Sequence, residues 1–189
     1  MTAIRRLWAM PAVRWGLAGA LVVFAAVLPL LNLVVPGVLP GPTYTPGTLQ
    51  ILALALIFSA LALSYHVLFG VTGMLSFGHA LYFAVGAYGL GIVLERTGLD
   101  LLPAVGLTLA GAIVVAALLG AISLRVSGIS FAMVTLAFAQ AGSVLIRRNP
   151  DVTGGEEGLG LETDHVPDWL VGVADTRNLY WLALAVIVV

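Results

Sequence analysis

From Trp15 to Leu94 the chain reads WGLAGALVVFAAVLPLLNLVVPGVLPGPTYTPGTLQILALALIFSALALSYHVLFGVTGMLSFGHALYFAVGAYGLGIVL, 80 residues without Asp, Glu, Lys or Arg. As one helix this stretch would measure about 120 Å at 1.5 Å per residue, whereas the hydrocarbon core of a bilayer is about 30 Å thick. It must therefore fold back on itself. Because only helices and closed barrels satisfy their backbone groups in lipid, the sequence predicts an all-α polytopic transmembrane helix bundle.

The composition of the whole chain supports this class. Of 189 residues 61% are apolar and 9% are charged, with a net charge of −1, whereas an average soluble domain has about 25% charged residues. The mean hydropathy of +1.11 excludes a disordered chain. The eight basic residues are all Arg and form no basic field for nucleic acid. With no cysteine, disulfides and thiolate chemistry are also excluded.

Turn residues and charges divide the chain into spans. A Pro- and Gly-rich stretch over 36–47 and a softer break over 70–76 interrupt the uncharged run. We expect five complete spans and the start of a sixth. In chain order they cover residues 16–35, 49–69, 77–94, 101–124, 129–146 and 179–189. A polar outer loop is expected over 147–178. Since eleven residues do not cross a bilayer, we expect residues 1–189 to be a single transmembrane domain truncated at its C-terminus.

The sidedness of the chain depends on the number of spans in residues 15–94. Two spans would place seven arginines inside and only Arg125 outside, which the positive-inside rule prefers. Three spans would place four arginines on each side. Two spans, however, would leave about 40 apolar residues that must double back, and irregular backbone exposed to lipid is not tolerated. We expect three spans and a cytoplasmic N-terminus, with two spans as the alternative.

Side chains inside the apolar stretches divide into small and polar ones. Two faces of small residues at helical spacing are expected to pack helices together: Ala112, Ala116 and Gly120, then Thr135, Ala139 and Ser143. The polar residues Ser76, His79 and Gln140 must face protein or water. No carboxylate lies in any expected span, so a proton relay through His79 lacks a second member, and a bracing role for this histidine is favoured over a place on a transport path.

Motifs for catalysis and for metal binding are absent from the sequence. There is no His-Glu-x-x-His, no Gly-x-Ser-x-Gly and no metal-ligand cluster among three scattered histidines. The Gly-rich segment over 153–160 lacks the Gly-Lys-[Ser/Thr] ending of a phosphate loop. We therefore expect no enzyme, no catalytic residue, no metal and no cofactor. If ATP drives the protein, another subunit hydrolyses it.

Three ordered segments resemble one family. Gly70-Val-Thr-Gly-Met-Leu-Ser-Phe-Gly-His-Ala-Leu-Tyr-Phe-Ala-Val-Gly-Ala-Tyr88 resembles the signature of branched-chain amino acid ABC transporter permeases of the LivM type. The segment Arg125-Val-Ser-Gly-Ile-Ser-Phe-Ala-Met-Val-Thr-Leu-Ala-Phe-Ala-Gln140 and the loop that begins Thr153-Gly-Gly are similar to two further family motifs in the same order. Ser130 and Gln140 depart from the family pattern, in which Tyr and an acidic residue are usual.

The resemblance implies a permease subunit of an importer in the bacterial inner membrane. Its expected partners are a second, LivH-like permease, two cytoplasmic ATPase subunits, a periplasmic substrate-binding protein and the lipid bilayer that surrounds it. The implied site residues are Ser76, Gly78, His79 and Gln140, on the path or bracing it, and Thr153, Gly154, Gly155 and Gly158 in an outer loop near the binding protein. The implied substrates are branched-chain amino acids, with urea or short amides as alternatives. An ATP-independent transporter or channel subunit is the alternative from another class.

Overall fold

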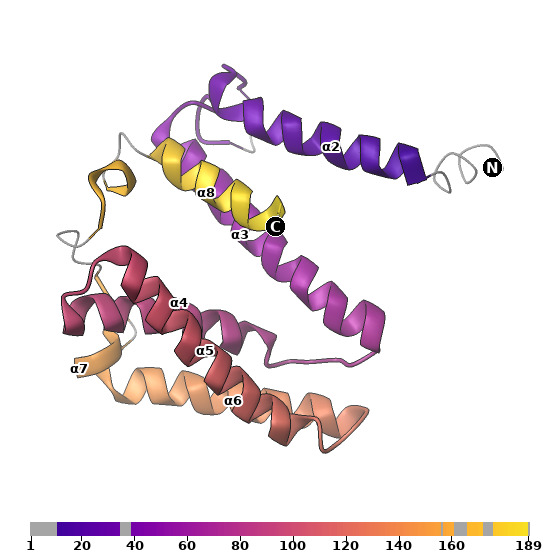
Figure 1. Cartoon of the computed structure of the whole chain (residues 1–189), viewed down its shortest axis with the longest axis vertical. Coiled ribbons are helices and arrows are strands. Elements are labelled where there is room, and N and C mark those ends of the chain that lie inside the picture. The colour runs from indigo at the N-terminus through magenta and orange to yellow at the C-terminus, as the bar shows by residue number, and fades with distance from the viewer. Residues whose placement is uncertain (1–10, 35–38, 156, 161–165, 172–175, 189) are drawn as a thin grey trace. The chain divides into compact units, whose positions relative to one another are not determined.

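A computed structural model describes residues 11–34, 39–155, 157–160, 166–171 and 176–188. Arg5 and Arg6, which are expected on the cytoplasmic side, lie outside these residues, as do parts of the Pro- and Gly-rich stretch and of the expected polar outer loop. Every regular element in the described part of the chain is helical (Figure 1). In chain order the elements are α2 (Pro11–Val27), η1 (Leu28–Leu30), α3 (Pro46–His66), η2 (Val67–Val71), α4 (His79–Thr97), α5 (Leu101–Ser123), α6 (Ile129–Arg148), α7 (Pro150–Thr153), η4 (Asp168–Leu170) and α8 (Thr176–Val188).

Three of the described helices are long and apolar enough to cross a bilayer: Pro46–Val71, Leu101–Ser123 and Ile129–Arg148. They correspond to the expected spans over 49–69, 101–124 and 129–146. Helix α4 covers the expected span over 77–94 but contains Glu95 and Arg96 in its last turns, which lowers its hydropathy. The apolar helices Gly16–Leu30 and Thr176–Val188 are shorter than a full span.

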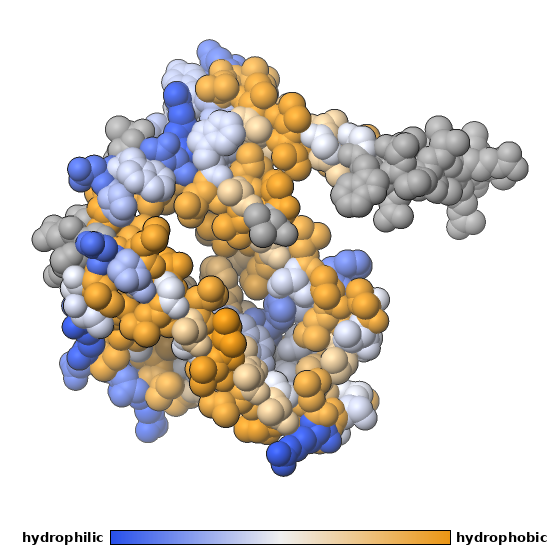
Figure 2. All heavy atoms as spheres, in the orientation of Figure 1, coloured by the Kyte–Doolittle hydropathy of each residue, from blue (hydrophilic) through white to orange (hydrophobic). Residues whose placement is uncertain are grey.

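The surface of the helices is hydrophobic. Leu102 and Ile129 are 86% and 81% exposed, and many other large apolar side chains point outward. Figure 2 shows hydrophobic residues over most of the visible face. A soluble monomer rarely exposes apolar patches larger than a few hundred Å². These outward faces are therefore suited to lipid, and the chain is a membrane protein.

By their internal contacts the helices form two compact units, Met1–Ala60 with Trp169–Val189, and Leu61–Asp168. In the first unit α3 and α8 lie side by side (Figure 1), because the buried side chains of Leu49 and Ala53 on α3 pack against those of Tyr180 and Ala183 on α8. The Tyr180 hydroxyl donates a hydrogen bond of 2.6 Å to the carbonyl oxygen of Ala25. This bond fastens α8 to α2.

In the second unit α4 packs against both α5 and α6. The contacts are close because glycines face the neighbouring helix. A Cβ atom at Gly89 would lie 3.1 Å from Cγ2 of Thr108 on α5. On α6, a Cβ atom at Gly142 would overlap Cδ1 of Leu81. Glycine at such positions allows helix backbones to approach closely in a membrane.

Between α3 and α4 the helix ends in a π turn, η2, and the chain then runs without regular structure to Gly78. Gly73 lies in this segment with a φ of +71°, a left-handed conformation that glycine adopts without strain. The π turn over Val67–Val71 carries the helix further than the expected end at residue 69. Such turns are rare overall, and those that occur are often found at functional sites.

Candidate functional site

A cavity of about 430 Å³ lies in the second unit, where the segment that leads into α4 meets α5 and α6. We call it the His79 cavity. Its volume is in the range of small-molecule sites, about 300–1,000 Å³. The lining residues come from four segments of the chain and are Ser64, Val67, Leu68, Ser76, His79, Tyr82, Ala116, Gly120, Ser123, Leu124, Phe131 and Thr135.

His79, the first residue of α4, is held by two residues of α3. Its Nε2 atom lies 2.6 Å from the Ser64 hydroxyl oxygen. The ring of Tyr65 meets the imidazole edge-on, with centroids 5.4 Å apart. The Ser64 hydroxyl donates its proton to the carbonyl oxygen of Leu61 at 3.0 Å. Because a hydroxyl has only one proton, this arrangement favours an imidazole that donates from Nε2 to Ser64.

The turn before α4 is pinned to α6 by Thr135. The Thr135 hydroxyl accepts a hydrogen bond of 3.2 Å from the backbone N–H of Phe77 and donates one of 2.9 Å to the carbonyl oxygen of Ala132. At Gly78 the backbones approach so closely that a Cβ atom would overlap the carbonyl oxygen of Thr135. Gly78 is therefore required by packing rather than by its φ of −98°.

The side chains that face the His79 cavity carry no formal charge when the histidine is neutral. Val67, Leu68 and Phe131 provide apolar walls. Ser76 is only 4% exposed, and its hydroxyl makes no hydrogen bond within the described part of the chain. Such a site can hold an aliphatic group and offer hydrogen bonds to a neutral one. It has no carboxylate to act with His79 in acid–base catalysis.

Two of the four expected path residues, Ser76 and His79, line this cavity, and Gly78 lies beside them against the backbone of Thr135. Gln140 is exposed on α6 and does not line it. Ala116 and Gly120, expected only to pack helices, form part of its wall. Sequence reasoning gave four hydroxyl-bearing residues no place at the site, and it expected Thr135 only to pack helices. Each of these four residues is a polar side chain inside an apolar span, and this is the sequence signal that points to them: Ser64, Tyr82, Ser123 and Thr135.

The expected outer-loop motif forms a compact turn after α7. The Thr153 hydroxyl lies within hydrogen-bond distance of the carbonyl oxygens of Ile146, at 2.6 Å, and of Asn149, at 2.8 Å, and accepts a bond of 3.3 Å from the N–H of Gly155. The three glycines of the motif have φ values of +69°, +59° and +78° at Gly154, Gly155 and Gly158. Left-handed backbone explains why glycine is needed at each.

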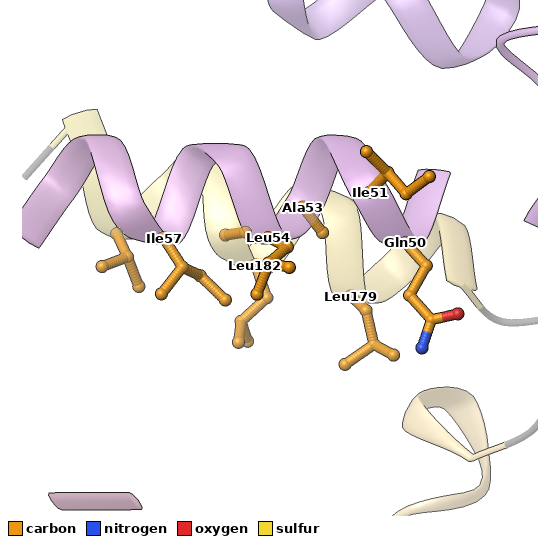
Figure 3. A pocket seen from close by; sticks show the side chains of 9 residues that line it. Gln50, Ile51, Ala53, Leu54, Ile57, Leu179 and Leu182 are labelled. Carbon is orange, nitrogen blue, oxygen red and sulfur yellow. The ribbon is translucent and has the colours of Figure 1, made fainter. Parts of the chain in front are cut away.

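The first unit has a groove of about 500 Å³ between α3 and α8, lined almost entirely by Leu, Ile, Ala and Val side chains. Gln50 supplies its one polar side chain and lies at one end beside Leu179, with Ile57 toward the other (Figure 3). This groove offers only apolar contact. Among the described residues there is also no group of three His, Asp or Glu side chains able to hold a metal ion. The His79 cavity is therefore the candidate site.

Known proteins similar to the chain are membrane transport components. Two curated relatives are named "High-affinity branched-chain amino acid transport system permease protein LivM". The protein from Escherichia coli (strain K12) is 35% identical over 116 residues, and that from Salmonella typhimurium (strain LT2) is 34% identical over 116 residues. Each match covers 60% of this chain and 27% of the relative, so the matched region is about a quarter of the relative's length. No solved structure matches the chain.

A family model extends the similarity beyond these pairwise matches. The model described as "Branched-chain amino acid transport system / permease component" matches residues 47–189. This range begins at the start of α3 and includes the whole His79 cavity and the Thr153 turn. The chain belongs to this family of permease components of branched-chain amino acid transport systems.

Proposed function

We propose that the chain is the membrane-spanning permease subunit of an ABC importer, and that it forms part of the translocation path for branched-chain amino acids or similar small polar solutes. The observation that carries the proposal is the family match over residues 47–189. The names of the two curated relatives support it. The lipid-suited surface of the helices and the uncharged His79 cavity agree with a role in passage rather than in chemistry.

In this proposal ATP is hydrolysed by a separate subunit, because the sequence has no Lys and hence no phosphate loop. The complete importer contains a second permease of the LivH kind, two cytoplasmic ATPases and a periplasmic substrate-binding protein. The chain lies in the bacterial inner membrane with its N-terminus in the cytoplasm and crosses the membrane five times before α8. ATP binding and hydrolysis shift the permease between states open to either side.

The His79 cavity has a defined part in this mechanism. Ser76, Gly78 and His79 hold the break before α4 against α6, so that irregular backbone at membrane depth is surrounded by protein. His79 braces the cavity through Ser64, and Gln140 on α6 faces the path or a neighbouring helix from outside the cavity. The turn that contains Thr153, Gly154, Gly155 and Gly158 lies on the outer side, near the binding protein.

Co-purification tests the ABC assignment. The tagged chromosomal protein is purified from its native membranes in mild detergent, and its companions are identified by mass spectrometry. We expect an ATPase with a Walker A motif and a second permease. Purification without any ATPase, under conditions in which another ABC importer of the same cells keeps its own, would contradict the proposal. Uptake of labelled leucine and urea by the complete transporter then separates the two substrate classes.

Histidine substitutions test the cavity. We expect His79→Ala in the complete transporter to lower leucine uptake at least tenfold, because it removes the bond to Ser64 and the contact with Tyr65. His66→Ala is the matched control, since His66 is exposed on the same stretch of chain and does not line the cavity. Expression is checked by immunoblot. Full uptake by His79→Ala at normal expression would remove His79 from the functional site.

A further inference from the structure

A second cavity in the same unit has a different character. It measures about 400 Å³ and lies between α4, α6 and the turn after α7. Its space exists because small residues line it, among them Ala84, Ala139 and Gly142. Its polar side chains are Tyr88, Ser143 and Arg147. Within the described part of the chain, none of these three makes a hydrogen bond or an ion pair, and no acidic side chain lines the cavity.

The helix directions place these three groups at one end of the unit. The start of α4 meets α6 at Gly78 and Thr135, and in the last turn of α4 Arg96 donates a hydrogen bond of 2.6 Å to the carbonyl oxygen of Asp151, which follows α6. The two helices therefore run in the same direction, and Tyr88 on α4 lies toward the end of α6 that bears Arg147. This end also adjoins Gly155 of the turn, which lines the cavity too.

The chemistry of the three groups matches a carboxylate. A guanidinium pairs with a carboxylate through two parallel hydrogen bonds, and the two hydroxyls supply further donors. An arginine in the last turn of a helix can also serve only to complement the helix dipole or to reach the membrane surface. Arg148, next in the sequence and equally exposed, can do the same without lining the cavity. The dipole role therefore does not account for the placement of Arg147.

We propose that this cavity binds the carboxylate group of a small amino acid, with Arg147 as the counter-ion and with Tyr88 and Ser143 as hydrogen-bond donors. The proposal rests on the proposed function for the class of ligand. It assigns recognition of the charged end of the solute to this cavity, whereas the His79 cavity offers apolar walls and neutral hydrogen-bonding groups. The two cavities are thus separate binding sites in the same unit.

Protection from chemical modification tests the site directly. The full chain in lipid nanodiscs is treated with phenylglyoxal, which modifies arginine, and the rate at each arginine is measured by peptide mapping with mass spectrometry. L-leucine at millimolar concentration is expected to slow modification of Arg147 at least fivefold, whereas L-leucinamide, which has no carboxylate, leaves it unchanged. Arg148 is the internal control and is expected to react equally in all samples. Equal protection by leucine and leucinamide, or equal protection of both arginines, would overturn the proposal.

A pair of variants gives an independent reading. Binding of labelled leucine to the same nanodiscs is measured by equilibrium dialysis. We expect Arg147→Gln to weaken binding at least tenfold, the effect of losing one hydrogen bond to a charged group, and Arg148→Gln to change it less than twofold. Equal effects of the two variants refute the site. Neither readout needs an ATPase, so failure of the ABC assignment in co-purification is distinguishable from failure of this cavity to bind.

Discussion

The contact between Gly78 and the backbone of Thr135 allows a sharp test of the fold. In Gly78→Ala the new Cβ atom would overlap the Thr135 carbonyl oxygen and lie 3.0 Å from its carbonyl carbon. Backbone atoms within α6 cannot turn aside as the tip of a side chain can. The turn must therefore move away, which also breaks the 3.2 Å hydrogen bond from the Phe77 N–H to Thr135. Overpacking costs about 1–3 kcal/mol and a lost hydrogen bond about 1 kcal/mol, so we expect a loss of about 2–4 kcal/mol in unfolding free energy.

The assay is unfolding of the full chain in mixed micelles by added SDS, followed by circular dichroism. Gly86→Ala is the control, because Gly86 lies in α4, the helix that Gly78 precedes, and a Cβ atom there meets nothing within 4 Å. Its stability is expected to stay the same or to rise by less than about 1 kcal/mol. Thr135→Val removes the hydrogen bond without the overlap and is expected to cost about 1 kcal/mol. If Gly78→Ala is as stable as Gly86→Ala, the reasoning about this turn is refuted.

Two further substitutions test single hydrogen bonds. Tyr180→Phe removes the bond to the Ala25 carbonyl oxygen and is expected to lower the unfolding free energy by about 1 kcal/mol. The control Tyr44→Phe, at an exposed tyrosine, is expected to leave the unfolding free energy unchanged. Equal stabilities of the two variants would show that the Tyr180 bond contributes nothing. Thr153→Val removes the acceptor for the Gly155 N–H and is expected to speed hydrogen exchange at that amide about fivefold, for about 1 kcal/mol. Thr153→Ser keeps the hydroxyl and is expected to preserve the slow exchange.

Much of the helical layout could be predicted because charge marks the helix ends. Asp100, Arg125 and Arg147 bracket the uncharged runs that form α5 and α6, and the expected limits fall within two residues of the observed ones. The expected start of α3 at residue 49 lies three residues after the observed one, because Pro46 also fits the Pro- and Gly-rich stretch before it. Proline is favoured at the first helical position, where its missing N–H is not needed, and this rule would have placed the start correctly.

The candidate site could be predicted only where its residues are close in sequence. Ser76, Gly78 and His79 share one motif, which is why the resemblance names all three as candidates, and their role stays a prediction. Ser64 and Thr135 come from other helices, and their approach to His79 depends on how α3 and α6 pack against the break. Hydropathy and spacing do not report such packing. The π turn η2 was likewise not foreseen, because its residues do not differ in type from those of an α-helix.

Gly78 and Gly120 differ in the room that they leave for a side chain. At Gly78 a methyl group has no room, whereas at Gly120, which lines the His79 cavity, a Cβ atom meets nothing within 4 Å. A change to alanine at Gly120 therefore takes volume from the cavity and disturbs no neighbour. Under the proposed function, one added methyl group at this wall would narrow the space open to a solute, while the turn at Gly78 stays fixed. Under that proposal, a change in selectivity requires no change of fold.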